Sequence, residues 1–284
     1  MKLSVINGAS KTSLSILKSL LKNSPSKISK IHLVDFFPNY SKFEDVFQFK
    51  DCLSNPPEIS LSKLGNKSTL SNSLADSDVL LYFTHDYFEN ATCKNELKRS
   101  VAKVAKSTLS LKKSIFVNLL EYSQFNEPNY LDLSLSVDRE LTQLSEKNIV
   151  LWSDLVYGND ASVGHHLKTT RFVKFDESPK NWVHADKVAN SISEAIEGHL
   201  PHQLNYIEKN EVMTGKHLVY ELELGEDAAT VTIPGKILTS LFSSAEEKHY
   251  LGLMDGHLNI EDKLVGYHKV DAKGNYPHLS ETSI

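Results

Sequence analysis

Cysteine is scarce in this chain of 284 residues, which contains only Cys52 and Cys93. Two cysteines are too few for a disulfide framework, so we expect a protein of a reducing compartment. Long apolar runs are also missing, because the longest candidate, Val79–Phe83, has the length of a strand and not the ~20 residues of a membrane span. We therefore expect no membrane-spanning segment.

Charge of one sign does not accumulate either. The net charge is −5, acidic and basic residues are mixed, and no basic stripe indicates a nucleic-acid partner. The first predicted strand begins at residue 2, so we expect no signal or transit peptide before the fold. The twelve histidines lack the spacing of metal ligands, and the adjacent His165 and His166 would diverge on a helix. No metal site is predicted.

Apolar strands alternate with amphipathic helical patterns up to about residue 200. The run 78–83 is apolar without alternation, which is typical of a strand covered on both faces. This order of elements predicts a doubly wound parallel sheet, a Rossmann-like α/β fold. Predicted strands are 2–6, 31–35, 78–83, 114–119 and 148–152, and predicted helices lie around 14–21, 97–105, 137–144 and 185–196.

The pattern changes after residue 207. Residues 218–224 and 231–233 alternate apolar and polar side chains around a Gly-Glu-Asp break, which predicts a β-hairpin with one solvated face. A helix is expected over 236–248. We therefore predict a Rossmann-like NAD(P)-binding-type domain over residues 1–207 and a small C-terminal α+β region over residues 208–284.

The loop after the first strand is short of glycine. A dinucleotide-binding βαβ unit carries glycines here, so that the backbone approaches pyrophosphate and the helix packs closely on the strand. This chain keeps Gly8, but Lys11 and Leu14 stand at the second and third glycine positions. The candidate cofactor-binding residues of this loop are Gly8, Ala9, Ser10, Lys11, Thr12 and Ser13.

The polar residues of this loop have two interpretations each. Lys11 either meets a diphosphate with its ammonium group or fills the space that a diphosphate would use. Ser10, Thr12 and Ser13 either bond a phosphate at the positive end of the helix, or Ser10 or Thr12 only caps that helix. Asp35 ends the second predicted strand, where an acid accepts ribose hydroxyls of NAD and repels the phosphate of NADP, but acids are also ordinary turn residues. The loop leaves NAD(P) binding open.

Four segments, in sequence order, resemble motifs of the extended short-chain dehydrogenase/reductase family. Residues 75–80, Ala-Asp-Ser-Asp-Val-Leu, are similar to its Gly-Ala-Asp-Val-Val motif, and residues 95–106 to the Asn-bearing helix that follows. Residues 149–158, Ile-Val-Leu-Trp-Ser-Asp-Leu-Val-Tyr-Gly, resemble the exit from the sixth strand, and residues 182–189 resemble Val-His-Val-x-Asp-Val-Ala. The resemblance implies the Rossmann-like fold and a cofactor. It places Thr84 and His85 where the family contacts the nicotinamide ribose, but the ordinary polarity of a loop is the favoured interpretation of these two residues.

The catalytic pair that the resemblance implies is missing. The family uses a tyrosine whose pKa is lowered by a lysine four residues later, and no tyrosine of this chain has a lysine at that spacing. Aligning Glu140 with the family's helix acid puts Asp132 and Ser136 at the two positions. We assign no catalytic residue. Tyr130 is the one shifted proton donor to consider, and an aromatic packing role is the favoured interpretation for it.

One branch of the family resembles this chain further. Residues 153–158, Ser-Asp-Leu-Val-Tyr-Gly, followed by Asp160, are similar to the Ser-Asp-Ile-Phe-Gly-x-x-Asp of dehydrogenase-like accessory subunits of mitochondrial respiratory complex I, although Trp152 replaces a proline. This implies a catalytically inactive subunit among the protein subunits of a larger complex, on the matrix side of the inner membrane and able to hold NAD(P). The alternatives are an atypical NAD(P)-dependent reductase or epimerase, and a cytoplasmic NAD(P)-sensing regulator.

Overall fold

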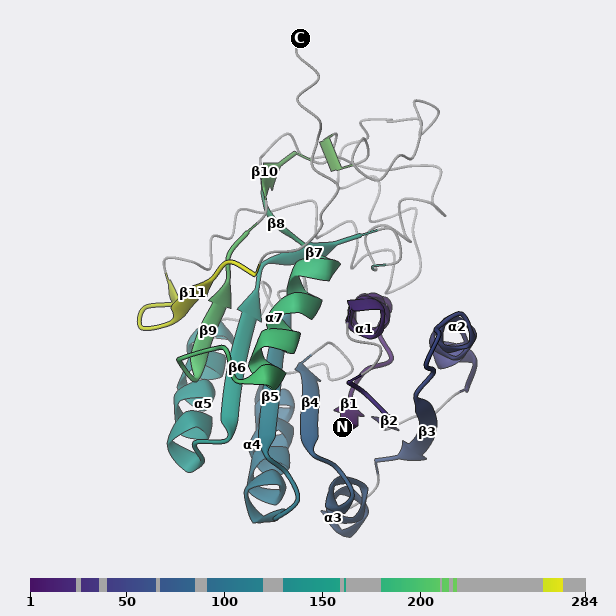
Figure 1. Cartoon of the computed structure of the whole chain (residues 1–284). Coiled ribbons are helices and arrows are strands. Elements are labelled where there is room, and N and C mark those ends of the chain that lie inside the picture. Colours follow the sequence, from purple (N-terminus) through teal and green to yellow (C-terminus); the bar gives the residue numbers. More distant parts are fainter. Residues whose placement is uncertain are drawn as a thin grey trace, which may run out of the picture.

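A computed structural model describes residues 1–23, 27–35, 40–64, 67–84, 91–119, 130–158, 161, 180–209, 211–214, 217–218 and 263–272. Within these residues, a large sheet lies between two layers of helices, and a small second sheet lies beyond one end of it (Figure 1). The strands of the large sheet are β1 (Lys2–Ile6), β2 (Lys30–Asp35), β3 (Glu58–Lys63), β4 (Val79–Thr84), β5 (Lys113–Leu119), β6 (Asn148–Ser153), β9 (Leu204–Ile207) and β11 (His268–Val270).

The large sheet has the order β11-β9-β6-β5-β4-β1-β2-β3, and every one of these neighbours is parallel. The strands β4 and β6 are buried along their whole length, as expected for strands covered on both faces. The order turns between β1 and β4, which is the switch point where ligands of such folds bind. The predicted doubly wound parallel sheet is confirmed.

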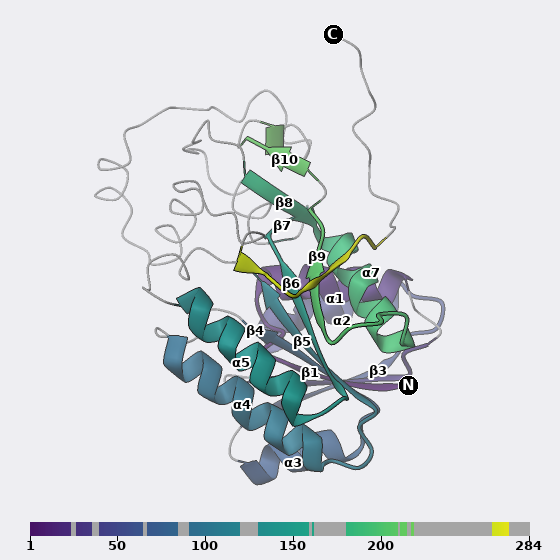
Figure 2. The ribbon, with the colours of Figure 1, turned by 90° about the vertical axis from the view of Figure 1, so that its left-hand side faces the viewer.

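Two layers of helices cover the sheet (Figure 2). One apolar core lies under α1 (Lys11–Asn23), α2 (Tyr40–Asp51) and α7 (Ala185–Glu197). The other lies under α3 (Lys67–Ala75), α4 (Ala91–Ser107) and α5 (Tyr130–Leu144). Because all strands of the large sheet run in the same direction, their carboxyl ends lie at one edge of the sheet, and the amino ends of the helices that follow them lie at the same edge.

The small sheet has the order β10-β8-β7 and consists of β7 (Leu155–Tyr157), β8 (Lys180–His184) and β10 (Glu211–Met213). The chain passes directly from β8 into α7, where the Nδ1 atom of His184 accepts the Asp186 amide proton and caps the helix. Gly198 ends α7 at φ 85°, a left-handed conformation that favours glycine.

The C-terminal part of the chain supplies strands to both sheets, since β10 pairs with β8 and β11 pairs with β9. The division at residue 207 stays a prediction. The predicted hairpin over 218–233 lies outside the described residues except for Leu218, and the predicted helix over 236–248 lies outside them altogether.

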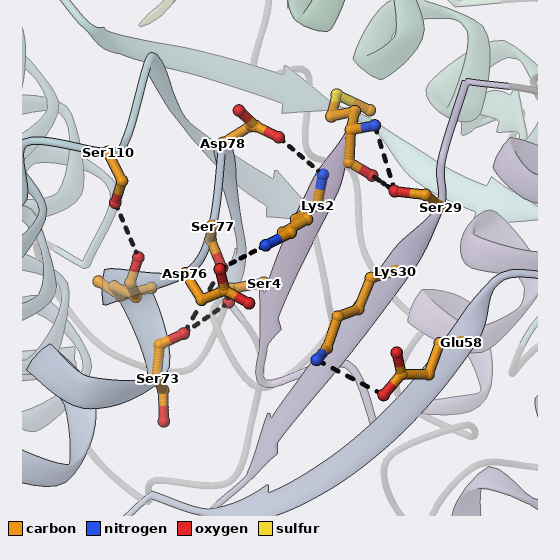
Figure 3. Close-up of polar contacts among 12 residues, drawn as sticks. Lys2, Ser4, Ser29, Lys30, Glu58, Ser73, Asp76, Ser77, Asp78 and Ser110 are labelled. Atoms are coloured by element: carbon orange, nitrogen blue, oxygen red, sulfur yellow. Dashed lines mark hydrogen bonds and ion pairs between the residues drawn. The ribbon is translucent and has the colours of Figure 1, made fainter.

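The amino ends of the strands are tied together by polar contacts (Figure 3). The Lys2 amide donates to Asp78 Oδ2 at 2.9 Å, and the Lys2 ammonium lies 2.5 Å from Asp76 Oδ1. Beneath them, the buried Ser4 hydroxyl bonds Ser77 Oγ at 2.6 Å and the Ser73 carbonyl at 3.1 Å. Ligands of this fold bind at the opposite edge, so we assign these contacts to the stability of the sheet.

Candidate functional site

The loop between β1 and α1 depends on Gly8. A Cβ at Gly8 would lie 2.9 Å from Val5 Cγ1, closer than real Cβ contacts come, so only glycine fits without a shift in the core. Asn7, just before it, has φ 58° and is one of the residue types that tolerate this left-handed region. The loop therefore keeps the tight turn of a phosphate-binding loop at its first position.

Ser10 is the N-cap of α1. Its Oγ accepts the Ser13 amide proton at 3.0 Å, its carbonyl accepts the Leu14 amide proton at 2.9 Å, and its hydroxyl proton goes to Ser13 Oγ at 2.8 Å. These bonds give acceptors within the chain to two backbone amides at the start of the helix, those of Ser13 and Leu14. Ser10 and Lys11 are both half-buried, so this turn is the part of the loop that solvent or a ligand reaches.

Leu14 takes the third glycine position and packs into the core. Its exposure is 3%, and it belongs to the apolar cluster shared by α1 and α7. The two helices also touch through the Ser19 hydroxyl, which donates to Asp186 Oδ1 at 2.5 Å. A glycine at this position would allow α1 to lie closer to the strand. Here the buried Leu14 side chain fills that space, and its apolar contacts hold α1 in place.

Asp35 and Thr84 lie at the same carboxyl edge as the loop. β1 is paired with β2 and β4, so Ile6 stands opposite both Val34 and Tyr82, and the loop that follows lies between Asp35 and Thr84. Asp35 is 1% exposed. The structure thus brings the predicted cofactor residues to one edge. His85, His165 and His166 lie outside the described residues.

Thr84 is directed into a buried polar cluster and not toward solvent. Its Oγ1 donates to Asn118 Oδ1 at 2.9 Å, and the Lys98 ammonium donates to the same oxygen at 2.8 Å. Lys98 also forms an ion pair with Asp138, whose side chain is fully buried. We call this set the Asp138 cluster. Its members are Thr84, Lys98, Asn118, Asp138, Trp152 and Tyr267.

Asp138 is surrounded by donors. Its Oδ2 accepts from Asn118 Nδ2 at 3.1 Å, from Trp152 Nε1 at 2.6 Å and from the Tyr267 hydroxyl at 3.1 Å, while Oδ1 faces Lys98. A buried ion pair is tolerated only when such additional hydrogen bonds compensate for lost hydration. Burial lowers the pKa of Lys98, and the charge of Asp138 acts in the opposite direction.

Tyr267 comes from the last described segment and lies against α5. Burial raises the pKa of its phenol, and the neighbouring Asp138 carboxylate raises it further. A tyrosine that works as a proton donor needs the reverse, a positive neighbour that lowers the phenol pKa. Tyr267 therefore stays protonated and serves as a hydrogen-bond donor to Asp138.

The alignment of α5 on Glu140 puts the two catalytic positions of the family on the exposed side of this helix. Asp132 and Ser136 lie on the exposed face of the helix, and Glu140 forms an exposed two-point contact with Arg99 at 2.7 and 2.9 Å. The pair with the same spacing that faces inward is Ser134 and Asp138. The inward face of α5 therefore carries a hydroxyl and a carboxylate at this spacing.

The facing helix α4 supplies the partners of this pair. Asn95 Nδ2 donates to Ser134 Oγ at 3.4 Å, and one turn later Lys98 meets Asp138. Sequence analysis missed both Lys98 and Asp138. The sequence did contain a signal for these two residues. Each is a charged residue beside the apolar stripe of a predicted helix, since Lys98 follows Leu97 and Asp138 follows Val137.

In the described part of the chain, no group of three or more His, Cys, Asp or Glu side chains is placed to hold a metal ion. Among the described helices, none has the length and apolarity to cross a bilayer. Cys52 and Cys93 are exposed thiols.

No family model and no curated protein matches the sequence. Solved structures do match. A dTDP-glucose 4,6-dehydratase from Streptomyces venezuelae, crystallised with NAD, is 14% identical with TM-score 0.56, over 89% of this chain and 96% of that one. A UDP-glucuronic acid 4-epimerase from Bacillus cereus in complex with NAD is 17% identical with TM-score 0.54, over 78% and 83%.

A nucleoside-diphosphate-sugar epimerase from Staphylococcus aureus is 12% identical with TM-score 0.57, over 94% of this chain and 96% of that one. At these identities the likeness shows the fold. The chain therefore has the fold of the NAD-dependent nucleotide-sugar epimerases and dehydratases, in line with the extended short-chain dehydrogenase resemblance of its sequence.

Proposed function

We propose that this chain is an NAD(P)-binding protein of the epimerase/dehydratase fold that holds the nucleotide without performing hydride transfer. The observation that carries the proposal is Asp138. This buried carboxylate of α5 binds the cation of Lys98 and accepts from the Tyr267 hydroxyl, and no tyrosine of the chain has a lysine four residues later.

The electrostatics of the site oppose the family's proton transfer. A lysine beside a phenol stabilises the phenolate, whereas the Asp138 carboxylate beside Tyr267 destabilises it. Thr84 and Asn118, which end β4 and β5, bond each other and the cluster. The hydrogen-bonding groups of these two side chains are thus used within the chain, at the strand ends where the family carries out its reaction.

The residues present fit the nucleotide end of NAD(P). Gly8 keeps the tight turn, the amino end of α1 favours an anion, and Lys11 in its first turn adds a positive charge. Asp35 at the end of β2 is placed for ribose hydroxyls and favours NAD over NADP. A bound NAD(P) would supply hydride chemistry. Solved proteins of this fold are crystallised with NAD.

Calorimetry with NADH and NADPH, together with turnover assays on UDP- and dTDP-sugars, tests this function. We expect saturable NADH binding, weaker NADPH binding and no NAD(P)-dependent product. Absence of binding to both nucleotides would overturn the nucleotide-holding role, and product formation would overturn the non-catalytic one.

An atypical reductase or epimerase is the second candidate, because the solved structures of this fold include NAD-bound dehydratases and epimerases. It requires another proton donor, and Tyr130 at the start of α5 is the candidate from the sequence. Activity with any sugar nucleotide that is lost in Tyr130→Phe would support this candidate. Activity that survives Tyr130→Phe would exclude Tyr130 as the donor.

The accessory-subunit role in respiratory complex I, with its partner subunits and matrix location, stays a prediction from residues 153–158. In the structure these residues serve the fold, since Ser153 Oγ donates to the Asp154 carbonyl at 3.1 Å and the buried Asp154 carboxylate accepts from Tyr206. Co-migration with the complex on native gels of mitochondrial membranes would support this role. A free monomer or dimer in the cytoplasmic fraction would instead favour the NAD(P)-sensing regulator.

A further inference from the structure

We propose that two copies of this chain form a two-fold dimer through the outer edge of β3, whose strands pair antiparallel so that the large sheet continues from one copy into the other. This surface has no part in the proposed nucleotide binding, and the dimer can be tested whether or not a nucleotide binds. The inference follows from three features of β3, which are its backbone directions, its apolar side chains and its terminal charges.

The backbone of β3 is paired on one side. β3 is the last strand of the large sheet, and β2 is the only described strand that pairs with it (Figure 1). The Glu58 amide donates to the Ser29 carbonyl at 3.0 Å, toward β2. Successive residues of a strand direct their backbone groups to opposite sides, so Ile59, Leu61 and Lys63 direct theirs away from β2. Such a row of N–H and C=O groups is a template for a further strand.

Two of these outward residues also carry the apolar side chains of the strand. Ile59 and Leu61 are half-buried and pack against the core that lies under α1, α2 and α7. Phe47 and Phe49 of α2 are half-buried as well and pack against the same core. Solvent therefore reaches apolar side chains on the α2 face of the sheet, on the same residues that turn their backbone groups outward.

Antiparallel pairing with a second copy matches these groups to one another. In an antiparallel pair, two residues that exchange backbone hydrogen bonds stand directly opposite, with their side chains on the same face of the sheet. With Ser60 at the two-fold axis, Ile59 of each copy lies opposite Leu61 of the other and exchanges both backbone bonds with it. These cross-strand apolar pairs would continue the core of one copy into that of the other.

The charges at the two ends of β3 favour the same arrangement. Glu58 begins the strand and Lys63 ends it, and both residues are exposed. Antiparallel pairing brings the Glu58 end of each copy beside the Lys63 end of the other, so that unlike charges meet at both ends of the junction. Parallel pairing would bring like charges together, which is unfavourable. The edge is therefore complementary to itself, and a second copy of this chain is the partner that it fits.

Sedimentation velocity of the full chain, from about 1 to about 100 µM, tests the dimer. We expect a concentration-dependent shift from monomer to dimer and no larger species, because a two-fold contact is closed. Leu61→Lys should raise the dissociation constant of the dimer at least about tenfold. Leu109→Lys, at a leucine that is 96% exposed after α4, is the control and should leave it unchanged. A monomer throughout this range, or equal dissociation constants for Leu61→Lys and the wild type, would overturn the proposal.

Charge reversal tests the orientation and keeps the apolar side chains in place. Glu58→Lys and Lys63→Glu should each weaken the dimer about fivefold, and the double variant should recover to within about twofold of the wild type. Glu146→Lys, in the exposed turn before β6, is the control and should have no effect. A double variant no better than the single variants would contradict antiparallel pairing. A different protein cross-linked at Lys63 in place of a second copy, in material from the natural source, would overturn the dimer.

Discussion

The two faces of the large sheet hold their helices by different means. Under α1 and α7 the interior is apolar, and Leu14 fills a position where the resembling family has glycine. Between α4 and α5 the interior contains the ion pair of Lys98 and Asp138, to which the strand ends contribute Thr84 and Asn118. One face is closed by apolar packing, and the other contains polar groups that bond one another.

Under the proposed function, this difference would let the chain keep the architecture of the fold without its hydride transfer. Substituting Leu14 for glycine changes packing and leaves a nucleotide able to approach Gly8 and the amino end of α1. The Asp138 carboxylate raises the pKa of the Tyr267 phenol, whereas the lysine of the family lowers the pKa of a tyrosine. Variants of Asp138 and Tyr267 should therefore affect the polar cluster, and a variant of Leu14 should affect the apolar packing.

Removing Asp138 should have the largest effect. Asp138→Ala leaves the Lys98 charge buried and unpaired, so we expect a loss of about 3–5 kcal/mol in the free energy of unfolding, measured by urea denaturation. Asp132→Ala, on the exposed face of the same helix, is the control and should stay within about 0.5 kcal/mol of the wild type. Equal effects of the two variants would contradict a central role for the cluster.

Shortening Leu14 should have the next largest effect. Leu14→Ala removes buried methyl groups and creates a cavity between α1 and α7, at a cost of about 3 kcal/mol in unfolding free energy. Leu109→Ala, at a leucine that is 96% exposed, should be nearly neutral. If Leu14→Ala cost no more than Leu109→Ala, the packing account of the third loop position would be wrong.

Removing one hydroxyl from the cluster should have a smaller effect. Tyr267→Phe deletes one donor to Asp138 and keeps the ring, so we expect a loss of about 1–2 kcal/mol in the free energy of unfolding. Hydrogen exchange should show faster opening of β11, three residues of which pair with β9. Unchanged exchange and unchanged stability would mean that Tyr267 does not anchor the segment 263–272.

The smallest effect should be a pH dependence at the amino end of α7. Burial lowers the pKa of His184 below its usual 6.5, so the folded protein favours the neutral ring. The stability that this provides is complete above pH 6.5 and is lost as the pH falls from 6.5 through the lowered pKa. His184→Asn retains a cap acceptor without the titration. The variant should therefore show a flatter stability curve over this range, and an unchanged curve would contradict the assignment.

The fold could be predicted from the sequence because strand runs such as Val79–Phe83 and the amphipathic helix at 185–196 carry the periodicities of a parallel sheet and its covering layer. The cofactor loop could be located because Gly8 follows the first strand directly. The Asp138 cluster could not be predicted, because its members are far apart in the sequence and only the tertiary fold pairs Lys98 on α4 with Asp138 on α5. The alignment of α5 on Glu140 does not point to this cluster, since that acid belongs to a surface pair with Arg99.

Native mass spectrometry of the protein purified from its source would test the central claim most directly. The account predicts a chain that carries one tightly held nucleotide whose mass matches NAD, NADP or their ADP-ribose portion, and that retains this nucleotide unchanged when sugar nucleotides are added. A chain recovered without nucleotide, or one that converts an added sugar nucleotide, would contradict it.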